Sequence, residues 1–212
     1  MEIKNIIWDF DGTLYDSYKC MISSFIKMLD SIEIYYDKKD LENMLKKSVN
    51  KTLIYYSDKY NLKLDEISKI FRRIDRLNAL SEIYMYKELN ILLLDLKDRN
   101  VKNFIFTHRD KKSTINLLKR DNYENLFDDI LCRDENIKRK PNPQGFKMLI
   151  EKNNLKLNET IVIGDRFIDI YAAKAVGVES ILVDFDGKII DKEINQQYVM
   201  VNSVDELRKE LI

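Results

Sequence analysis

The stretch Ile6-Ile7-Trp8-Asp9-Phe10-Asp11-Gly12-Thr13-Leu14 decides the fold of this chain. A short apolar run leads into two carboxylates and a glycine, which predicts a buried strand with polar groups at its carboxyl end. Side chains alternate between the faces of a strand, so Asp9 and Asp11 are expected to point the same way, with Phe10 opposite. Two like charges in one small space are costly unless a cation joins them or one takes a proton. The pair therefore predicts a functional site.

Length and composition limit what the chain can be. Its 212 residues allow one large domain or a core with a smaller companion, and 45% hydrophobic residues suffice for a core. The 36 basic and 36 acidic residues cancel, which gives no general attraction to nucleic acid or membrane. The sequence shows no apolar run of membrane-span length and no signal-peptide pattern, and Cys20 and Cys132 lack metal-type spacing. We expect a soluble, cytoplasmic protein, monomeric by default with a dimer left open.

The hydrophobic pattern divides the chain into two parts. Residues 3–8 predict a strand, and residues 17–99 are mostly helical, with a strand-like fragment at 53–56. After residue 100, strands alternate with helices. The predicted strands are 101–107, 129–132, 160–164, 181–185 and 198–201, and the predicted helices are 111–120, 143–153, 167–176 and one from residue 204.

This alternation predicts an α/β fold with a Rossmann-like parallel sheet. The predicted core domain comprises residues 1–15 and 85–212, and a helical domain, residues 16–84, is inserted after the first strand. Functional sites in such sheets form at the carboxyl ends of the strands. Polar segments follow four of the predicted strands at these ends: residues 9–13, 107–109, 138–141 and 164–169.

The chemistry of these segments suits a phosphate and a hard cation. They contain acids, a hydroxyl and a lysine, with no cysteine and with the one histidine of the chain, which favours Mg²⁺ over zinc. Hydroxyl and ammonium groups suit the oxygens of a phosphate. A carboxylate beside a phosphoryl group can act as a nucleophile, and a second acid can protonate the leaving oxygen and later activate water.

In their order along the chain, the four segments resemble the motifs of the haloacid dehalogenase superfamily. The resemblance is to phosphatases with a helical cap, similar to phosphoglycolate phosphatases and β-phosphoglucomutase-like members, and it covers nearly the whole chain. The first motif is highly specific, whereas the second is weak by itself. The matching residues, in order, are Asp9 to Thr13, Thr107, Lys140 before Pro141, and Gly164-Asp165 with Asp169.

The resemblance implies a Mg²⁺-dependent phosphatase that acts on a small phosphorylated metabolite through an aspartyl-phosphate. Asp9 would be the nucleophile, and Asp11 the general acid and base. Thr107 and Lys140 would bind the phosphoryl group, and Lys140 would also steady the nucleophile. The implied Mg²⁺ ligands are Asp9, the main-chain carbonyl of Asp11, and Asp165, and the supporting residues are Gly12 at a sharp turn, Thr13, Gly164 and Asp169.

The roles of several residues stay open at this level. His108 is a candidate phosphate-binding residue and equally a structural one, whereas Arg109 fits a surface position better than a substrate contact. Asp169 either supports the metal or caps the helix that begins near it. The stretch Asp184-Phe185-Asp186-Gly187 repeats the letters of the first motif, but a strand-ending turn is the preferred interpretation because lysine follows it.

The function also has alternatives. A sugar-phosphate mutase of the same superfamily would use the same residues, and a non-catalytic protein that binds a phosphorylated ligand is less favoured. Dehalogenation is disfavoured because that branch needs neither Mg²⁺ nor an acid at the position of Asp11.

Lys138 and Arg139 compete with Lys140, although the following proline favours Lys140. The expected partner is a small phosphate ester, with no nucleic acid or membrane.

Overall fold

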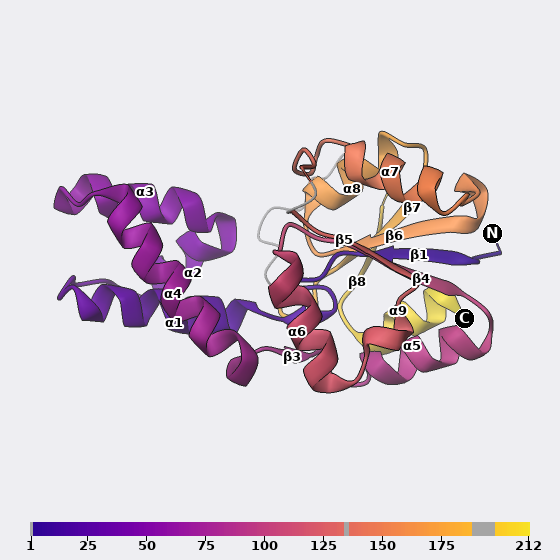
Figure 1. Ribbon diagram of the computed structural model, residues 1–212, viewed down its shortest axis with the longest axis horizontal. Coiled ribbons are helices and arrows are strands. Elements are labelled where there is room, and N and C mark those ends of the chain that lie inside the picture. The colour runs from indigo at the N-terminus through magenta and orange to yellow at the C-terminus, as the bar shows by residue number, and fades with distance from the viewer. Residues whose placement is uncertain (1, 134–135, 188–197) are drawn as a thin grey trace. The chain divides into compact units, whose positions relative to one another are not determined.

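The structure is a computed structural model that describes residues 2–133, 136–187 and 198–212, apart from the side chains of residues 46 and 47 (Figure 1). It divides the chain into two compact units. The α/β unit contains Met1–Asp16 and Tyr84–Ile212, and the helical unit is Ser17–Ile83. These junctions lie one residue from the predicted domain boundaries. Two short antiparallel strands, β2 (Tyr15–Asp16) and β3 (Tyr84–Met85), pair where the chain leaves and re-enters the α/β unit.

A parallel sheet forms the centre of the α/β unit, as predicted. In the described part of the chain it has six strands in the order β5-β4-β1-β6-β7-β8. Their bounds are β1 Asn5–Trp8, β4 Lys102–Phe106, β5 Asp129–Leu131, β6 Thr160–Gly164, β7 Glu179–Val183 and β8 Val199–Val201. β7 lies two residues earlier than predicted, because its pairing with β6 begins with Glu179 opposite Ile161.

The strand order places the first motif at the centre of the sheet. From β1 the chain moves to one side through β4 and β5, and then returns to the other side through β6, β7 and β8. Trp8, the last residue of β1, lies opposite Ile105 of β4 and Ile163 of β6. The segments that follow these three strands therefore begin at the same edge of the sheet, at the switch point where ligands bind in folds of this type.

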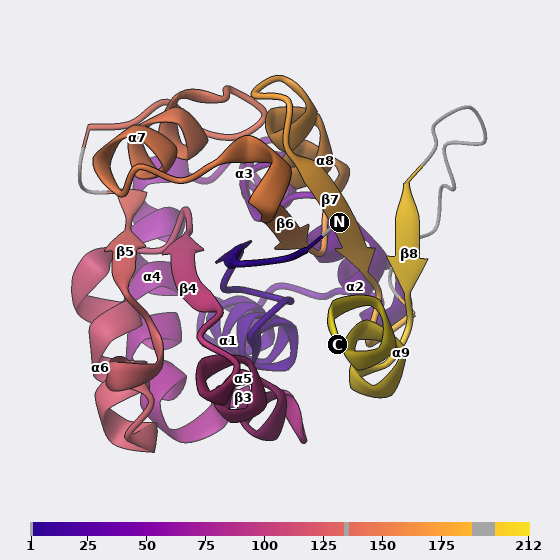
Figure 2. The same cartoon turned by 90° about the vertical axis from the view of Figure 1, so that its right-hand side faces the viewer.

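Helices cover both faces of the sheet. α7 and α8 lie on one face, and α5, α6 and α9 lie on the other (Figures 1 and 2). Their bounds are α5 Leu89–Asp98, α6 Lys111–Asp121, α7 Gln144–Lys152, α8 Phe167–Lys174 and α9 Val204–Leu211. Each predicted helix is present within two residues at either end, and Pro143 precedes α7 as its N-cap residue instead of occupying its first turn.

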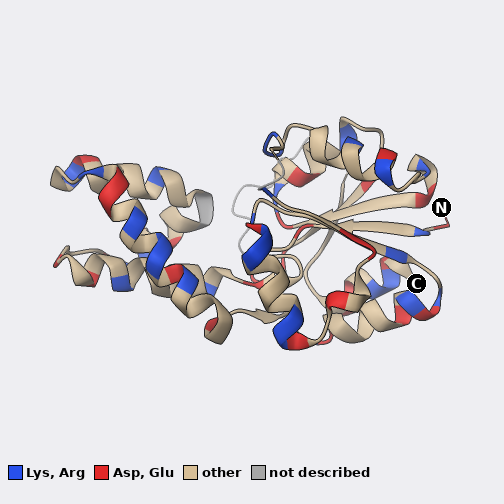
Figure 3. Ribbon diagram, in the orientation of Figure 1, with Lys and Arg blue, Asp and Glu red and all other residues tan. Residues whose placement is uncertain are grey.

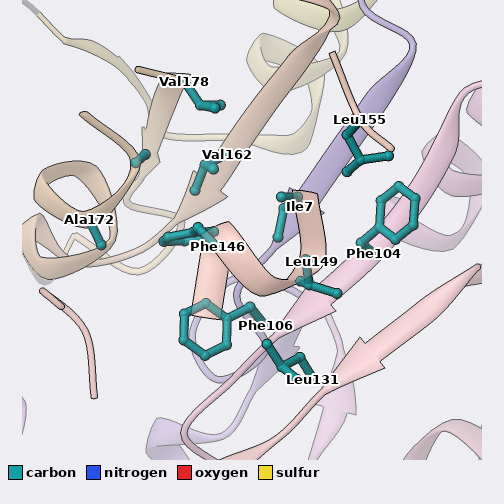
Figure 4. Close-up of a cluster of buried hydrophobic side chains, with 11 residues drawn as sticks. Ile7, Phe104, Phe106, Leu131, Phe146, Leu149, Leu155, Val162, Ala172 and Val178 are labelled. Atoms are coloured by element: carbon teal, nitrogen blue, oxygen red, sulfur yellow. The ribbon is translucent and has the colours of Figure 1, made fainter. Parts of the chain in front are cut away.

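One apolar core holds the strand ends in place. Side chains from β1, β4 and β6 gather against α7 and α8 (Figure 4). Phe106, at the end of β4, packs edge-to-face on Phe146 of α7 with ring centroids 4.9 Å apart. All four residues of β1 are buried, and its apolar residues 6–8 are typical of a central parallel strand. The core therefore fixes the ends of the strands that precede Asp9 and Thr107.

The helical unit has a core of its own. Its helices are α1 Tyr18–Ser31, α2 Lys38–Lys47, α3 Val49–Tyr60 and α4 Leu64–Glu82. The strand-like fragment predicted at 53–56 is wrong, because these residues lie inside α3. The helical period turns Leu53 and Tyr56, both 4% exposed, into the core, and leaves Ile54 and Tyr55 39% and 43% exposed.

Charged residues of both signs are interspersed along the helices of each unit (Figure 3). Among the described residues, no helix is long and apolar enough to cross a membrane.

Candidate active site

Lys140 lies between two buried carboxylates at the carboxyl edge of the sheet. Its Nζ atom is 2.8 Å from Asp9 Oδ1 and 2.6 Å from Asp169 Oδ1. Nζ also donates a hydrogen bond to the main-chain carbonyl of Phe106 at 3.0 Å. The side chains of Lys140 and Asp169 are 0% exposed and that of Asp9 is 3% exposed. This group joins the predicted first, third and fourth motifs.

The competing cations of the third segment do not share this position. Lys138 and Arg139 are exposed, whereas Lys140 is buried. The proline therefore follows the one buried cation of the three, and the catalytic role of Lys140 stays a prediction.

The charges in this group support one another. Burial disfavours the Lys140 ammonium, but the nearby charges of Asp169 and Asp9 outweigh it and raise the pKa of Lys140. Burial also raises the pKa of Asp9, and the charge of Lys140 offsets part of this effect. Removal of one partner from a buried ion pair typically costs about 3–5 kcal/mol, because the other charge is left uncompensated.

Three acids form a group that fits a divalent cation. One carboxylate oxygen from each of Asp9, Asp165 and Asp169 lies within 4.8 Å of the others. Asp9 Oδ2 is buried without a hydrogen-bond partner among the described residues. A buried carboxylate oxygen without a donor is costly, and oxygen ligands of this kind suit Mg²⁺. The side chain of Asp11 is not in this group; its implied ligand was the main-chain carbonyl, which stays a prediction.

Asp169 reaches the site from the first turn of α8. Its Oδ2 atom accepts a hydrogen bond from the main-chain N–H of Arg166 at 3.2 Å, so it caps the helix while Oδ1 contacts Lys140. The glycine at the end of β6 makes room for this carboxylate, because a Cβ atom on Gly164 would lie 2.5 Å from the Asp169 side chain. Helix capping and contact with the site, which the sequence left as alternatives, occur together.

The segment after β4 supplies a hydroxyl and an imidazole. Thr107 is buried, and its Oγ1 accepts a hydrogen bond from the main-chain N–H of Arg109 at 3.0 Å. A hydroxyl that accepts one bond keeps its own hydrogen for another acceptor. His108 Nε2 accepts a hydrogen bond from the main-chain N–H of Lys140 at 2.8 Å. The described contact of His108 is therefore structural: it holds the segment that carries the lysine.

Burial, together with the charge of Lys140, lowers the pKa of His108 to about 3. A neutral imidazole at neutral pH is consistent with an acceptor role at Nε2. No sequence pattern predicts this contact, because the two residues lie on separate segments.

Arg109 forms an ion pair that the sequence did not predict. Its Nη1 atom lies 2.7 Å from Asp11 Oδ1, and its side chain is 12% exposed, so the surface position expected for it is wrong. Asp11 is 35% exposed. The two carboxylates of the first motif thus have separate cationic partners, Lys140 for Asp9 and Arg109 for Asp11.

The turn after β1 follows from Gly12. Its φ of 82° lies in the left-handed region that favours glycine, and its N–H donates to the Tyr15 carbonyl at 2.8 Å. Phe10 stacks on the Tyr15 ring with centroids 4.5 Å apart, beneath this turn. Thr13 is fully buried, and its hydroxyl has no hydrogen-bond partner among the described residues.

The repeated letters at 184–187 form a turn, as predicted. The Gly187 N–H donates to the Asp184 carbonyl at 3.3 Å, and Gly187 has a φ of 61°. Asp186 accepts a hydrogen bond of 2.5 Å from the hydroxyl of Tyr86, the residue after β3. Burial and this bond raise the pKa of Tyr86. The sequence did not reveal this link between the turn and the segment that follows the helical unit.

Fold and site together define a class: a parallel α/β protein with an acid group and a buried lysine at the switch point, and a helical insertion after the first strand. The family model of haloacid dehalogenase-like hydrolases matches residues 6–183. The chain therefore belongs to the haloacid dehalogenase-like hydrolase family, and the predicted family and hydrolase class are confirmed.

The chain is similar to a relative in sequence and to solved structures in fold. The chain is 25% identical over 211 residues to the pyrophosphatase PpaX of Halalkalibacterium halodurans, covering 97% of this chain and 95% of the relative. A protein of Haemophilus somnus 129PT described as a predicted phosphoglycolate phosphatase is 18% identical, with a TM-score of 0.81 and 99% of each chain covered. A haloacid dehalogenase-superfamily hydrolase of Geobacter sulfurreducens PCA is 16% identical, with a TM-score of 0.77 and coverage of 99% and 96%. These two structures are similar to this chain in fold.

Proposed function

We propose that the protein is a Mg²⁺-dependent phosphatase that forms an aspartyl-phosphate on Asp9. One observation carries the proposal: the buried Asp9 carboxylate has one oxygen on Lys140 and the other without a donor, in a residue that shares a group of acids with Asp165 and Asp169. A nucleophile for phosphoryl transfer needs one oxygen that no donor already occupies, and a neighbouring cation can hold the carboxylate in place. Family membership supports the same reaction class.

The reaction proceeds in two displacements. An oxygen of Asp9 attacks phosphorus, and the bond from phosphorus to the leaving oxygen breaks as Asp11 donates a proton to that oxygen. Water then attacks the phosphorus of the aspartyl-phosphate, and Asp11 takes a proton from this water. The bond from phosphorus to Asp9 breaks, which releases inorganic phosphate and restores the free carboxylate. Asp11 thus serves as acid first and as base second.

Other residues of the edge bind and orient the phosphoryl group. The Thr107 hydroxyl and the Lys140 ammonium would contact its oxygens, while Lys140 keeps Asp9 in position. Asp9, Asp165 and the main-chain carbonyl of Asp11 would hold Mg²⁺, with Asp169 in support. The cation would offset charge on the phosphoryl oxygens. We assign the helical unit the role of a cap that selects the substrate.

A small phosphorylated metabolite is the proposed substrate class, either phosphoglycolate-like or a sugar phosphate. The relatives named pyrophosphatase, which match this chain over most of its length, favour inorganic pyrophosphate as a second candidate. A sugar-phosphate mutase would return the phosphoryl group to the substrate instead of releasing it. Assay of released phosphate and of isomerised hexose phosphate separates these activities.

The first prediction tests the nucleophile. Wild-type protein should release phosphate from members of a phosphate-ester panel with Mg²⁺ and lose this activity in excess EDTA. Asp9→Asn should lower kcat by about 10³-fold or more, because an amide cannot form the aspartyl-phosphate. Asp98→Asn, which removes an exposed acid of α5, is the matched control and should retain activity.

Two results would contradict this function. Full turnover by Asp9→Asn would rule out the aspartyl-phosphate mechanism. Failure of wild-type protein to hydrolyse any ester or pyrophosphate with Mg²⁺ would instead support a non-catalytic protein that binds a phosphorylated ligand.

A further inference from the structure

The cation beside Asp11 is Arg109, and the mechanism above gives this residue no role. Arg109 Nη1 lies 2.7 Å from Asp11 Oδ1. Its Nε atom donates to Ser113 Oγ at 2.9 Å, and its guanidinium carbon lies 5.9 Å from the centroid of the Phe10 ring. Contacts with the first-motif segment and with the first turn of α6 therefore fix the position of this charge.

Lys140 and Arg109 differ in their surroundings. Lys140 lies between Asp9 and Asp169 with a side chain that is 0% exposed. The pair of Arg109 and Asp11 retains 12% and 35% exposure. The Arg109–Asp11 pair is therefore less deeply buried than the Lys140–Asp9 pair. Lys140 is committed to the buried carboxylates.

The proposed role of Asp11 places Arg109 next to the leaving group. A general acid must come within hydrogen-bond distance of the oxygen that it protonates. A guanidinium 2.7 Å from the same carboxylate then lies within a few ångströms of atoms attached to that oxygen. At such separations in a partly desolvated site, charges interact more strongly than they do in bulk water.

We propose that Arg109 is a specificity-determining residue that favours substrates whose leaving group carries its own negative charge close to the scissile bond; this rests on the phosphatase function proposed above. The positive charge of the guanidinium would attract the negative charge that such a leaving group carries. Neutral alcohol leaving groups gain little from it. Both candidate types of leaving group carry an anion near the bridging oxygen. This anion is either a carboxylate one methylene away or a second phosphoryl group.

Two pairs of substrates test the proposal. 2-Phosphoglycolate and 2-hydroxyethyl phosphate differ in a carboxylate, and pyrophosphate and methyl phosphate differ in a charged leaving group. The ratio of kcat/KM between Arg109→Gln and wild type is measured for each substrate, so the intrinsic reactivity of each cancels. Arg109→Gln should lower kcat/KM for an anionic member about 10- to 100-fold more than for its neutral partner, mainly through KM, because a charge-assisted contact is lost.

Matched variants separate specificity from structure. Lys112→Gln removes an exposed charge from α6 and should leave all ratios near wild type. Arg109→Lys keeps a charge and should retain a measurable preference for the anionic members. Ser113→Ala removes the acceptor of Arg109 Nε and should shift the preference in the same direction as Arg109→Gln by a smaller factor. If circular dichroism and thermal unfolding show that Arg109→Gln does not fold, Ser113→Ala takes its place in the test.

The outcomes are distinct. A larger loss in either pair supports the proposal, and the pair affected identifies the anion as carboxylate or phosphoryl. Equal losses for the anionic and neutral members overturn it and leave Arg109 as a structural partner of Asp11, while the phosphatase function stands. Wild-type protein that hydrolyses none of the four substrates and no other phosphate ester overturns the proposed function itself.

Discussion

At the residue scale, the candidate site depends on polar contacts between segments that are far apart in the sequence. Lys140 meets Asp9 across 131 positions, and Arg109 meets Asp11 across 98. Burial makes an unpaired charge costly, so removal of one partner destabilises the other. His108 also makes a contact between distant segments: as a neutral acceptor it binds the main-chain N–H of Lys140.

His108 should make stability sensitive to mild acid. Its pKa is lowered from 6.5 to about 3 in the folded protein. Between these values the unfolded chain binds a proton that the folded chain does not, so stability rises with pH and is lost as pH falls below 6.5. We expect a contribution below about 1.4 kcal/mol per pH unit, reduced because the ring is partly exposed to solvent. Urea unfolding between about pH 5 and 6.5 measures this slope.

His108→Gln is the matched variant, since glutamine can offer an acceptor near the position of Nε2 but does not titrate. The free energy of unfolding of this variant should depend less steeply on pH than that of wild type over the same range. Parallel slopes for the two proteins would contradict the assigned role of His108.

At the element scale, the junction of β6 and α8 brings an acid against a lysine. The strand ends at Gly164, and the helix presents Asp169 from its first turn. This acid caps its own helix through Arg166 N–H and pairs with Lys140. The geometry requires a residue without a Cβ atom at the end of the strand, because a Cβ would overlap Asp169.

Gly164→Ala tests this junction. The added Cβ would lie 2.5 Å from Asp169, so the helix or the carboxylate must move. We expect a loss of about 1–3 kcal/mol in the free energy of unfolding, as for an overpacked core, together with weaker stabilisation by Mg²⁺. Thermal unfolding with and without Mg²⁺ measures both effects.

Gly187→Ala is the control for Gly164→Ala. Gly187 has a φ of +61°, but among the described residues no atom beyond its chain neighbours lies within 4 Å of its hypothetical Cβ. Alanine there should cost roughly 1–2 kcal/mol through backbone strain and leave the Mg²⁺ response unchanged. If both variants kept a wild-type Mg²⁺ response, the close packing at Gly164 would not matter for the acid group.

At the scale of the whole molecule, the residues of the candidate site all belong to the α/β unit. The helical unit has its own core, and the insertion starts and ends at directly paired residues, Asp16 and Tyr84. A two-residue Asn-Gly turn between these residues can therefore replace 17–83, since such turns connect antiparallel strands. The core and the acid group of the α/β unit would remain.

The shortened protein should unfold cooperatively and be stabilised by Mg²⁺. A ligand at 100 times its Kd stabilises a folded state by about 2.7 kcal/mol, which is readily measured as a rise in Tm. Asp165→Asn in the same shortened chain should abolish the rise. A shortened chain that folds but gives no Mg²⁺-dependent rise would contradict the assignment of the metal site to this unit.

Much of the fold could be predicted because its signals are local. The apolar runs of β1 and β6 and the helical stripe of α6 predict elements within one or two residues. The pairing of β2 with β3 was missed because two-residue strands show no periodicity. The fragment at 53–56 was misassigned because a short apolar run suits either a strand or a buried helix face, and only packing against other helices decides.

By itself the sequence determined the family, the α/β class and the residue types at the carboxyl edge, because periodicity and motif order are local properties of the chain. Only the tertiary structure decided which polar groups meet: Lys140 with Asp9 and Asp169, Arg109 with Asp11, and His108 with the main chain of Lys140. The physical reason is that the free energy of an ion pair depends on distance and burial. Neither quantity is a property of a residue type, and both arise when the strands and helices pack.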